Sequence, residues 1–207
     1  MMNSLFPATH TAFVGHRLLA AGPLPDVALA VKAAAPRSAD AILVFEDATG
    51  RQIDLDLSGT DADVVRRHPA VEPEERPPLD LAPAPAAARA RGRPKLGVVA
   101  REVTLLPRHW EWLAAQPGGA SVALRKLVEK ARRENESADR RRRRQEAAYR
   151  YMSSMAGNLP GFEEAVRALY ADDPQAFAEH VQSWPEDVRA YATRLAWRDA
   201  QVREDLA

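Results

Sequence analysis

Near the start of the chain, segments with the apolar spacing of strands are followed by a segment with the apolar spacing of a helix. Short apolar runs at residues 11–14 and 17–20 flank Gly15, a pattern typical of a β-hairpin. Apolar positions then recur at helical spacing over residues 27–34 and stop at Pro36. The pattern predicts a hairpin followed by a helix.

A second strand-rich stretch follows this helix. Residues 41–46 form an apolar, partly β-branched run, and beyond a turn residues 52–57 alternate apolar and polar side chains. A short helix is expected at residues 61–67. We therefore predict a small α+β domain over residues 9–68, with its elements in the order ββαββα.

Residues 69–90 are rich in proline and alanine and have little periodic apolar content. This composition is typical of an extended linker. The linker is expected to separate the N-terminal domain from a middle segment, residues 91–134, in which the periodicity returns.

The middle segment predicts a strand, a helix, a tight turn and a second helix. Residues 103–105 form the strand, Pro107 fits the first turn of a helix, and residues 117–119 break that helix. Beyond the break, apolar residues recur at helical spacing. They are Leu124, Leu127, Val128 and Ala131.

Residues 135–202 predict a helical C-terminal region. Its helices begin near prolines or acidic residues, as helix N-termini prefer. Inward positions are expected at Tyr151, Met152, Met155, Phe162, Leu169, Phe177, Val188, Tyr191 and Leu195. The fold class predicted for the whole chain is α+β.

Charge is distributed unevenly, although the net charge of the 207 residues is zero. Residues 1–88 hold 7 Lys and Arg against 12 Asp and Glu, residues 89–150 hold 17 against 7, and residues 151–207 hold 5 against 10. The three parts carry net charges of −5, +10 and −5. A basic middle between acidic ends favours a polyanionic partner, with nucleic acid as the leading candidate.

The segment Arg91-Gly92-Arg93-Pro94-Lys95, preceded by Arg89, resembles the core of an AT-hook. Glycine lets the backbone approach the floor of a groove, proline holds an extended turn, and the arginines point along the groove. The narrow minor groove of A·T-rich DNA has an enhanced negative potential that attracts such arginines. The alternative interpretation is an ordinary charged linker end.

Residues 101–133, REVTLLPRHWEWLAAQPGGASVALRKLVEKARR, resemble the ribbon-helix-helix family of bacterial DNA-binding proteins in element order, turn position and spacing. In that family one strand from each chain of a dimer pairs into a ribbon that enters the major groove. The resemblance implies a homodimer with ribbon contacts near Arg101 and Thr104. It also implies phosphate contacts at a helix N-terminus near Ala120 and Ser121.

The outward side of such a ribbon would depart from the family, whose residues there are usually basic or amide. This chain offers Glu102, Thr104 and Leu106, or, in the shifted register, Arg101, Val103 and Leu105. The resemblance therefore concerns the fold more than the reading of bases.

An unbroken run of five arginines lies within a predicted helix and allows two interpretations. Successive side chains point all around a helix axis, which is typical of a solvated connector. Alternatively, the arginines contact phosphates without sequence preference, with an affinity that falls as salt rises. The run consists of Arg140, Arg141, Arg142, Arg143 and Arg144.

Several kinds of chemistry are disfavoured. The absence of cysteine excludes disulfides and thiolate sites, and the five scattered histidines predict no metal site. Asp54 with Asp56 and Asp61 with Asp63 fit an outward strand face and a helix first turn. We therefore expect neither a cofactor nor catalysis. No apolar run is long enough to span a membrane, and a cytoplasmic location is expected.

Residues 9–196 also resemble a family of bacterial proteins classed as a domain of unknown function. Two segments carry the resemblance, GRPKLGVVAREVTLLPRHWEWLAAQPGGASVALRKLVEKAR and NLPGFEEAVRALYADD. This resemblance implies no activity.

Together these patterns favour a non-catalytic, dimeric DNA-associated protein of the bacterial cytoplasm, either a transcriptional regulator or a nucleoid-associated protein, that prefers A·T-rich duplex. An alternative is a protein-interaction adaptor whose basic middle binds an acidic partner. An enzyme of unknown type ranks third. The patterns indicate no target sequence, no direction of regulation and no small-molecule effector.

Overall fold

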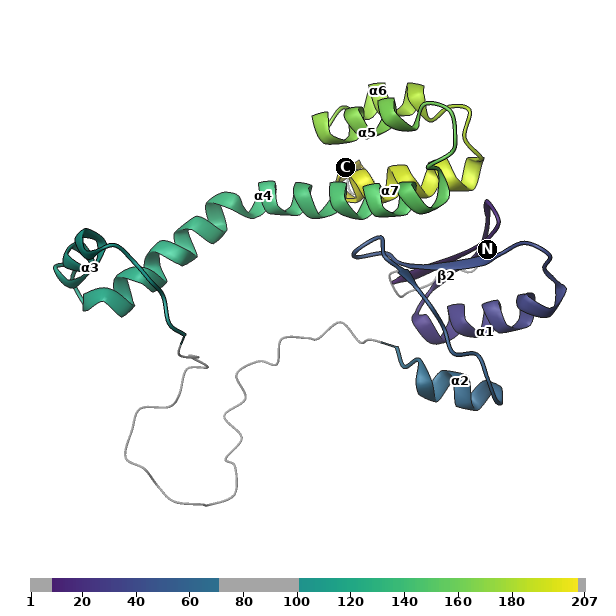
Figure 1. Ribbon diagram of the computed structural model, residues 1–207, viewed down its shortest axis with the longest axis horizontal. Coiled ribbons are helices and arrows are strands. Elements are labelled where there is room, and N and C mark those ends of the chain that lie inside the picture. Colours follow the sequence, from purple (N-terminus) through teal and green to yellow (C-terminus); the bar gives the residue numbers. More distant parts are fainter. Residues whose placement is uncertain (1–8, 71–100, 205–207) are drawn as a thin grey trace, which may run out of the picture. The chain divides into compact units, whose positions relative to one another are not determined.

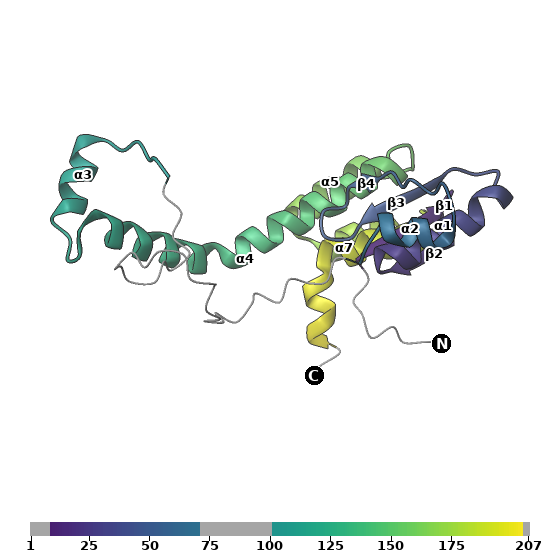
Figure 2. The same cartoon turned by 90° about the horizontal axis from the view of Figure 1, so that it is seen from below.

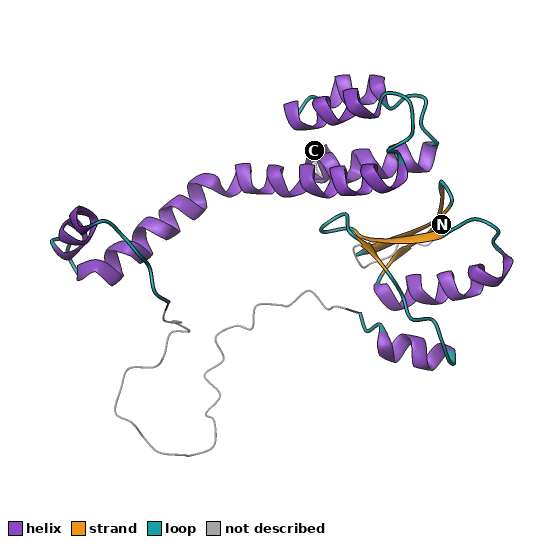
Figure 3. Ribbon diagram, viewed as in Figure 1, coloured by secondary structure: helices purple, strands orange, loops and turns teal. Residues whose placement is uncertain are grey.

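The computed structural model describes residues 9–70 and 101–204. These residues form a mixed α+β protein whose strands precede Asp61 and whose later elements are helices (Figure 3). The chain has two compact units. One joins Met1–Pro73 to Ala138–Ala207, and the other is Glu74–Ser137.

An antiparallel four-stranded sheet is the centre of the first unit (Figure 1). Its strands, in the spatial order β2-β1-β3-β4, are β1 (His10–Val14), β2 (Arg17–Gly22), β3 (Ile42–Glu46) and β4 (Gln52–Ile53). The alternation predicted over residues 52–57 gives backbone pairing only at Gln52 and Ile53 among the described residues. Leu55 and Leu57 still pack their side chains against the core, so the apolar pattern persists without a ladder.

α1 (Leu24–Ala34) covers one face of this sheet, and α2 (Asp61–Arg67) packs beside α1. α1, followed by the 3-10 helix η1 (Ala35–Arg37), buries Val27 and Val31 against Ala12 and Val44 of the sheet. α2 begins with a capping box in which Thr60 and Asp63 bond each other's backbone N–H. Seen from below, both helices lie in front of the strands (Figure 2).

The opposite face of the sheet packs against α4 (Gly119–Met155) and α7 (Glu186–Glu204), whose helical geometry is interrupted at Trp197. α5 (Phe162–Ala171) and α6 (Pro174–His180) lie on the far side of these two helices from the sheet (Figure 1). Phe13 and Phe45 point to this side, and their rings meet Tyr151 and Tyr191 at centroid separations of 4.9 to 5.5 Å. Residues 9–68 and 135–202, expected to be separate parts, therefore share one core.

The turn between β3 and β4 fixes the sheet onto α4. Gly50 has a φ of +64°, and a Cβ atom at this position would overlap the backbone carbonyl oxygen of Ala147 in α4. Arg150 of α4 also donates to the Thr49 carbonyl oxygen at 3.1 Å. Backbone meets backbone here, so only glycine fits at position 50.

The second unit contains α3 (Pro107–Ala114), a turn at Gly118 and the first half of α4. Pro107 occupies the first turn of α3, which confirms that prediction. The strand predicted at residues 103–105 does not form within the described part of one chain, where residues 101–106 belong to no regular element. A strand needs a partner for its backbone groups, and these residues find none among the described residues of their own chain.

α4 is a single helix of 37 residues. The sequence predicted separate helices on either side of a boundary between residues 134 and 135, and that prediction was wrong. Residues 120–155 contain neither glycine nor proline, and the Asn135 side-chain amide donates to the Ala131 carbonyl oxygen at 2.8 Å across the expected boundary. The boundary expected between residues 134 and 135 thus falls inside one helix.

Candidate nucleic-acid interface

α4 carries more positive charge than any other element that the structure describes. It holds 11 Lys and Arg against 5 Asp and Glu, a net charge of +6, and most of these side chains are exposed. Repulsion between these like charges is offset because acidic residues lie three or four positions from basic ones. Examples are Glu129 with Arg132 at 2.9 Å and Lys130 with Glu134 at 3.7 Å.

These ion pairs lie on the surface and can exchange for other partners. The hydrogen bonds from Arg132 and Arg133 lower the pKa of Glu129, so that its carboxylate stays ionised. Exposed pairs of this kind contribute little net stability. A phosphate group could therefore replace the acidic partner at small cost.

The first half of α4 has two different faces. Lys126, Lys130 and Arg133 follow one another at i, i+4 and i+7, so they share one side of the helix. Leu124, Leu127, Val128 and Ala131 lie on the other side. Leu127 and Val128 are 45% and 64% exposed, although their spacing predicted a buried stripe.

The five arginines at 140–144 do not share one role. Arg141 pairs with Asp172 beyond the end of α5 at 3.7 Å, and Arg142 pairs with Asp139 on its own helix at 2.9 Å. Arg143 is exposed and has no ion pair with any described residue. Directly after the run, Gln145 is buried and donates to the Leu169 carbonyl oxygen, so the charged surface ends where the core begins.

The other predicted contact residues lie around α3. Arg101 and Thr104 are exposed in the segment that precedes it, and Ala120 and Ser121 occupy the first turn of α4. Ser121 is exposed, and its carbonyl oxygen accepts from the Arg125 guanidinium at 3.1 Å. The arginine-rich segment predicted to contact the minor groove lies outside the described residues; its members are Arg89, Arg91, Gly92, Arg93, Pro94 and Lys95.

The second unit exposes an unusual amount of apolar surface for its size. Among residues 101–137 two side chains are buried, those of Leu113 and Ala123. Six large apolar side chains are 41–64% exposed, and we call them the apolar surface: Val103, Leu106, Trp110, Trp112, Leu127 and Val128. Two buried residues are too few for an independent core. Large apolar side chains exposed together in this way are typical of an interaction surface.

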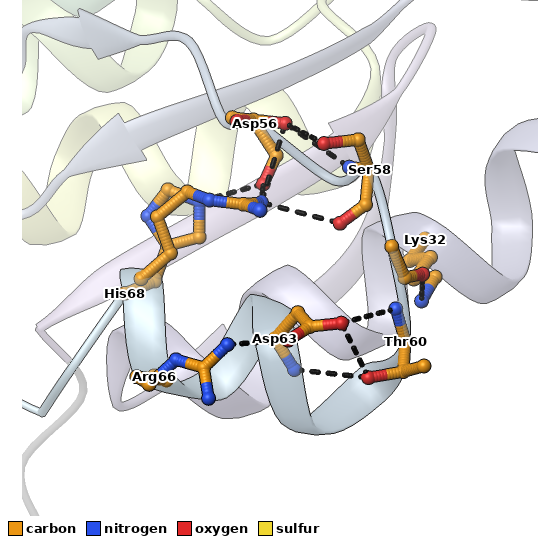
Figure 4. Close-up of polar contacts among 9 residues, drawn as sticks. Lys32, Asp56, Ser58, Thr60, Asp63, Arg66 and His68 are labelled. Carbon is orange, nitrogen blue, oxygen red and sulfur yellow. Dashed lines mark hydrogen bonds and ion pairs between the residues drawn. The ribbon is translucent and has the colours of Figure 1, made fainter.

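The acidic residues near α2 form a structural cluster (Figure 4). Asp63 bonds the Thr60 backbone N–H and pairs with Arg66, while Asp56 accepts from Ser58 and pairs with Arg67. The hydrogen bonds from Thr60 and Ser58 lower the pKa values of Asp63 and Asp56 respectively, and keep both ionised. Asp63 lies in the first turn of α2, as the sequence predicted, whereas Asp56 lies in the loop before α2 and not on the strand face predicted for it.

A buried polar cluster joins the sheet to α7. The Asp47 carboxylate accepts from the Thr11 hydroxyl at 2.8 Å and from the Tyr191 hydroxyl at 2.7 Å. Arg194 approaches the second carboxylate oxygen at 3.5 Å and lies 4.7 Å from the centre of the Tyr191 ring. Burial and the Asp47 charge raise the pKa of Tyr191, which stays protonated as a donor. The bonds tie strands to a distant helix, and no signal near Asp47 in the sequence indicates them.

A comparison with protein families identifies one match. The model of a family described as "Uncharacterized protein conserved in bacteria (DUF2239)" matches residues 9–196. The chain belongs to the DUF2239 family. Comparisons with curated proteins and with solved structures find no match.

The DUF2239 match covers both units, from β1 into α7, and includes the basic residues of α4. In the described part of this family member, no group of three or more potential metal ligands gathers, and no helix is long and apolar enough to cross a membrane. The family description names no activity.

Proposed function

We propose that this protein is a non-catalytic DNA-associated protein, of the regulatory or nucleoid-associated type. The observation that carries the proposal is the exposed positive charge of α4, +6 over one continuous helix. Lysine and arginine side chains that neutralise phosphates release counterions from DNA, which drives binding without sequence preference. Lys126, Lys130 and Arg133 on one face supply such contacts.

A preference for A·T-rich duplex is assigned to the arginine-rich arm, residues 89–95. An arginine inserted into a narrow minor groove meets a deeper negative potential than one on the open surface. α4 then provides affinity, and the arm provides the preference. Because the two roles differ, substitutions of arginines in the arm and in α4 should have different effects on binding to A·T-rich and G·C-rich duplexes.

A homodimer fits this proposal. A second copy would cover the apolar surface of the second unit and would give residues 103–105 a partner with which to form the predicted strand. It would also place two arms on one particle, so that the second arm binds at a raised effective concentration. Weak single contacts then add up to a useful affinity.

Removing the arm's arginines should abolish the preference for A·T-rich DNA. We expect Arg91→Ala with Arg93→Ala to weaken binding to an A·T-rich duplex roughly tenfold and binding to a G·C-rich duplex much less. Gel-shift titration of both duplexes at two salt concentrations measures this.

The matched control is Arg142→Ala with Arg143→Ala. Both side chains are exposed on α4, and neither contacts the core, unlike the neighbouring Arg141, which pairs with Asp172. The control should weaken binding to both duplexes equally. Equal losses on A·T-rich DNA for the two double variants, or no A·T preference in the unmodified protein, would rule out the AT-hook assignment.

A further inference from the structure

Two tyrosine rings lie side by side on the surface of the first unit. Tyr149 of α4 and Tyr170 of α5 have ring centroids 6.1 Å apart and planes inclined by 51°. Tyr149 is 40% exposed and Tyr170 is 52% exposed. The other two tyrosines, Tyr151 and Tyr191, are buried in the aromatic core, so this exposed pair is not part of that packing.

Basic side chains flank this tyrosine pair. Arg142 lies seven residues before Tyr149, and two helical turns place them on the same side of α4, about 10 Å apart along its axis. Arg141 pairs with Asp172, two residues after Tyr170. On the other side, Arg150 approaches Glu146 at 3.4 Å, beside the same rings. All three arginines are engaged in exposed ion pairs, which exchange readily.

The small apolar area of this surface indicates the kind of partner that it binds. Between residues 138 and 197, where side-chain exposure is described, no other large apolar side chain is exposed. A protein partner would need a wider apolar patch than two tyrosine rings. Aromatic rings between arginines are instead the arrangement that binds unpaired nucleotides, because every base has a face that can stack and every nucleotide carries a phosphate.

We propose that Tyr149 and Tyr170 form a stacking platform for the bases of single-stranded nucleic acid, with Arg141 and Arg142 contacting the adjoining phosphates. This inference rests on the proposed association with DNA and specifies a second form of it. In an intact duplex the faces of the bases are covered by their neighbours. The tyrosine pair therefore distinguishes an unpaired strand from a duplex, whereas the charge of α4 serves both.

The test compares two double variants of the full chain. Tyr149→Leu with Tyr170→Leu removes both rings, and Tyr149→Phe with Tyr170→Phe keeps them. Fluorescence anisotropy measures the binding of a labelled oligothymidylate of about 15 nucleotides. A duplex and an abasic oligomer of equal charge are measured in the same way as separate ligands. We expect the leucine variant to bind oligothymidylate about tenfold more weakly, the phenylalanine variant to bind as the unmodified protein does, and duplex binding to stay within twofold throughout.

The abasic oligomer separates stacking from charge. It should bind the unmodified protein and the leucine variant equally, since it offers no base to stack. Equal binding of oligothymidylate by the leucine variant and the unmodified protein would overturn the platform and leave duplex association standing. Failure of the unmodified protein to bind any of the three nucleic acids at low salt would overturn the proposed function itself. Thermal unfolding of both variants checks that the exposed positions leave the fold intact.

Discussion

Replacing Gly50 with alanine should lower the free energy of unfolding by roughly 3 kcal/mol or more. Position 50 has a φ of +64°, which costs an L-residue about 1–2 kcal/mol. The added Cβ atom would also overlap the Ala147 carbonyl oxygen, and overpacking typically costs a further ~1–3 kcal/mol. Because the obstacle is the backbone of α4, no side chain can move aside to relieve it. The midpoint of thermal unfolding should fall by roughly 6–12 °C.

Gly15→Ala is the matched control for this substitution. Gly15 lies in the turn between β1 and β2 with a similar φ of +55°, but its new Cβ would meet the carboxylate of Asp40, a side chain, at 3.3 Å. This variant should therefore show the conformational cost alone. Equal loss of stability in the two variants, measured by denaturant unfolding, would mean that the β3–β4 turn does not press on α4 and that the shared core is packed differently.

Replacing Thr104 with proline should dissociate the expected dimer. Proline removes a backbone N–H at the centre of the predicted ribbon, and a symmetric dimer loses that hydrogen bond twice. At about 1 kcal/mol each, the loss amounts to ~2 kcal/mol, or about 30-fold in the dissociation constant. Exposure of the apolar surface should follow, so we also expect weaker DNA binding and loss of structure in residues 100–133.

Sedimentation equilibrium at micromolar concentration measures this effect, with Thr104→Val as the control. Valine keeps the N–H donor and favours strands, so that variant should remain dimeric. If the unmodified protein is a monomer and its middle segment is nonetheless folded, the ribbon-helix-helix interpretation is wrong. The strand would then have its partner within the same chain.

Local patterns in the sequence predicted the inner faces of the helices well. Tyr151, Met152 and Met155 recur at helical spacing, and all three are buried. Pro107 at the start of α3 was equally predictable, because a helix's first turn needs no N–H from it. Both features depend on residues a few positions apart, where spacing determines structure.

Contacts across long distances in sequence could not be predicted in this way. Asp47 looks like a turn residue, yet it is buried beneath Tyr191, 144 residues away. The apolar run at residues 41–46 does not indicate which helices pack against it. Leu127 and Val128 show the converse limit, since their spacing indicates an apolar face but not whether the same chain covers it. The exposed tyrosine pair was missed because Tyr149 and Tyr170 become neighbours only when α5 packs on α4.

The salt dependence of duplex binding tests the central proposal most directly. If the exposed lysines and arginines of α4 contact DNA phosphates, the logarithm of the binding constant should fall linearly with the logarithm of salt concentration. With five or more phosphates neutralised, the slope should be about −4 or steeper, and affinity should drop at least a few hundredfold between about 50 and 200 mM salt. Binding that is absent at 50 mM salt, or that hardly changes across this range, would contradict the proposal that α4 is a DNA-binding helix.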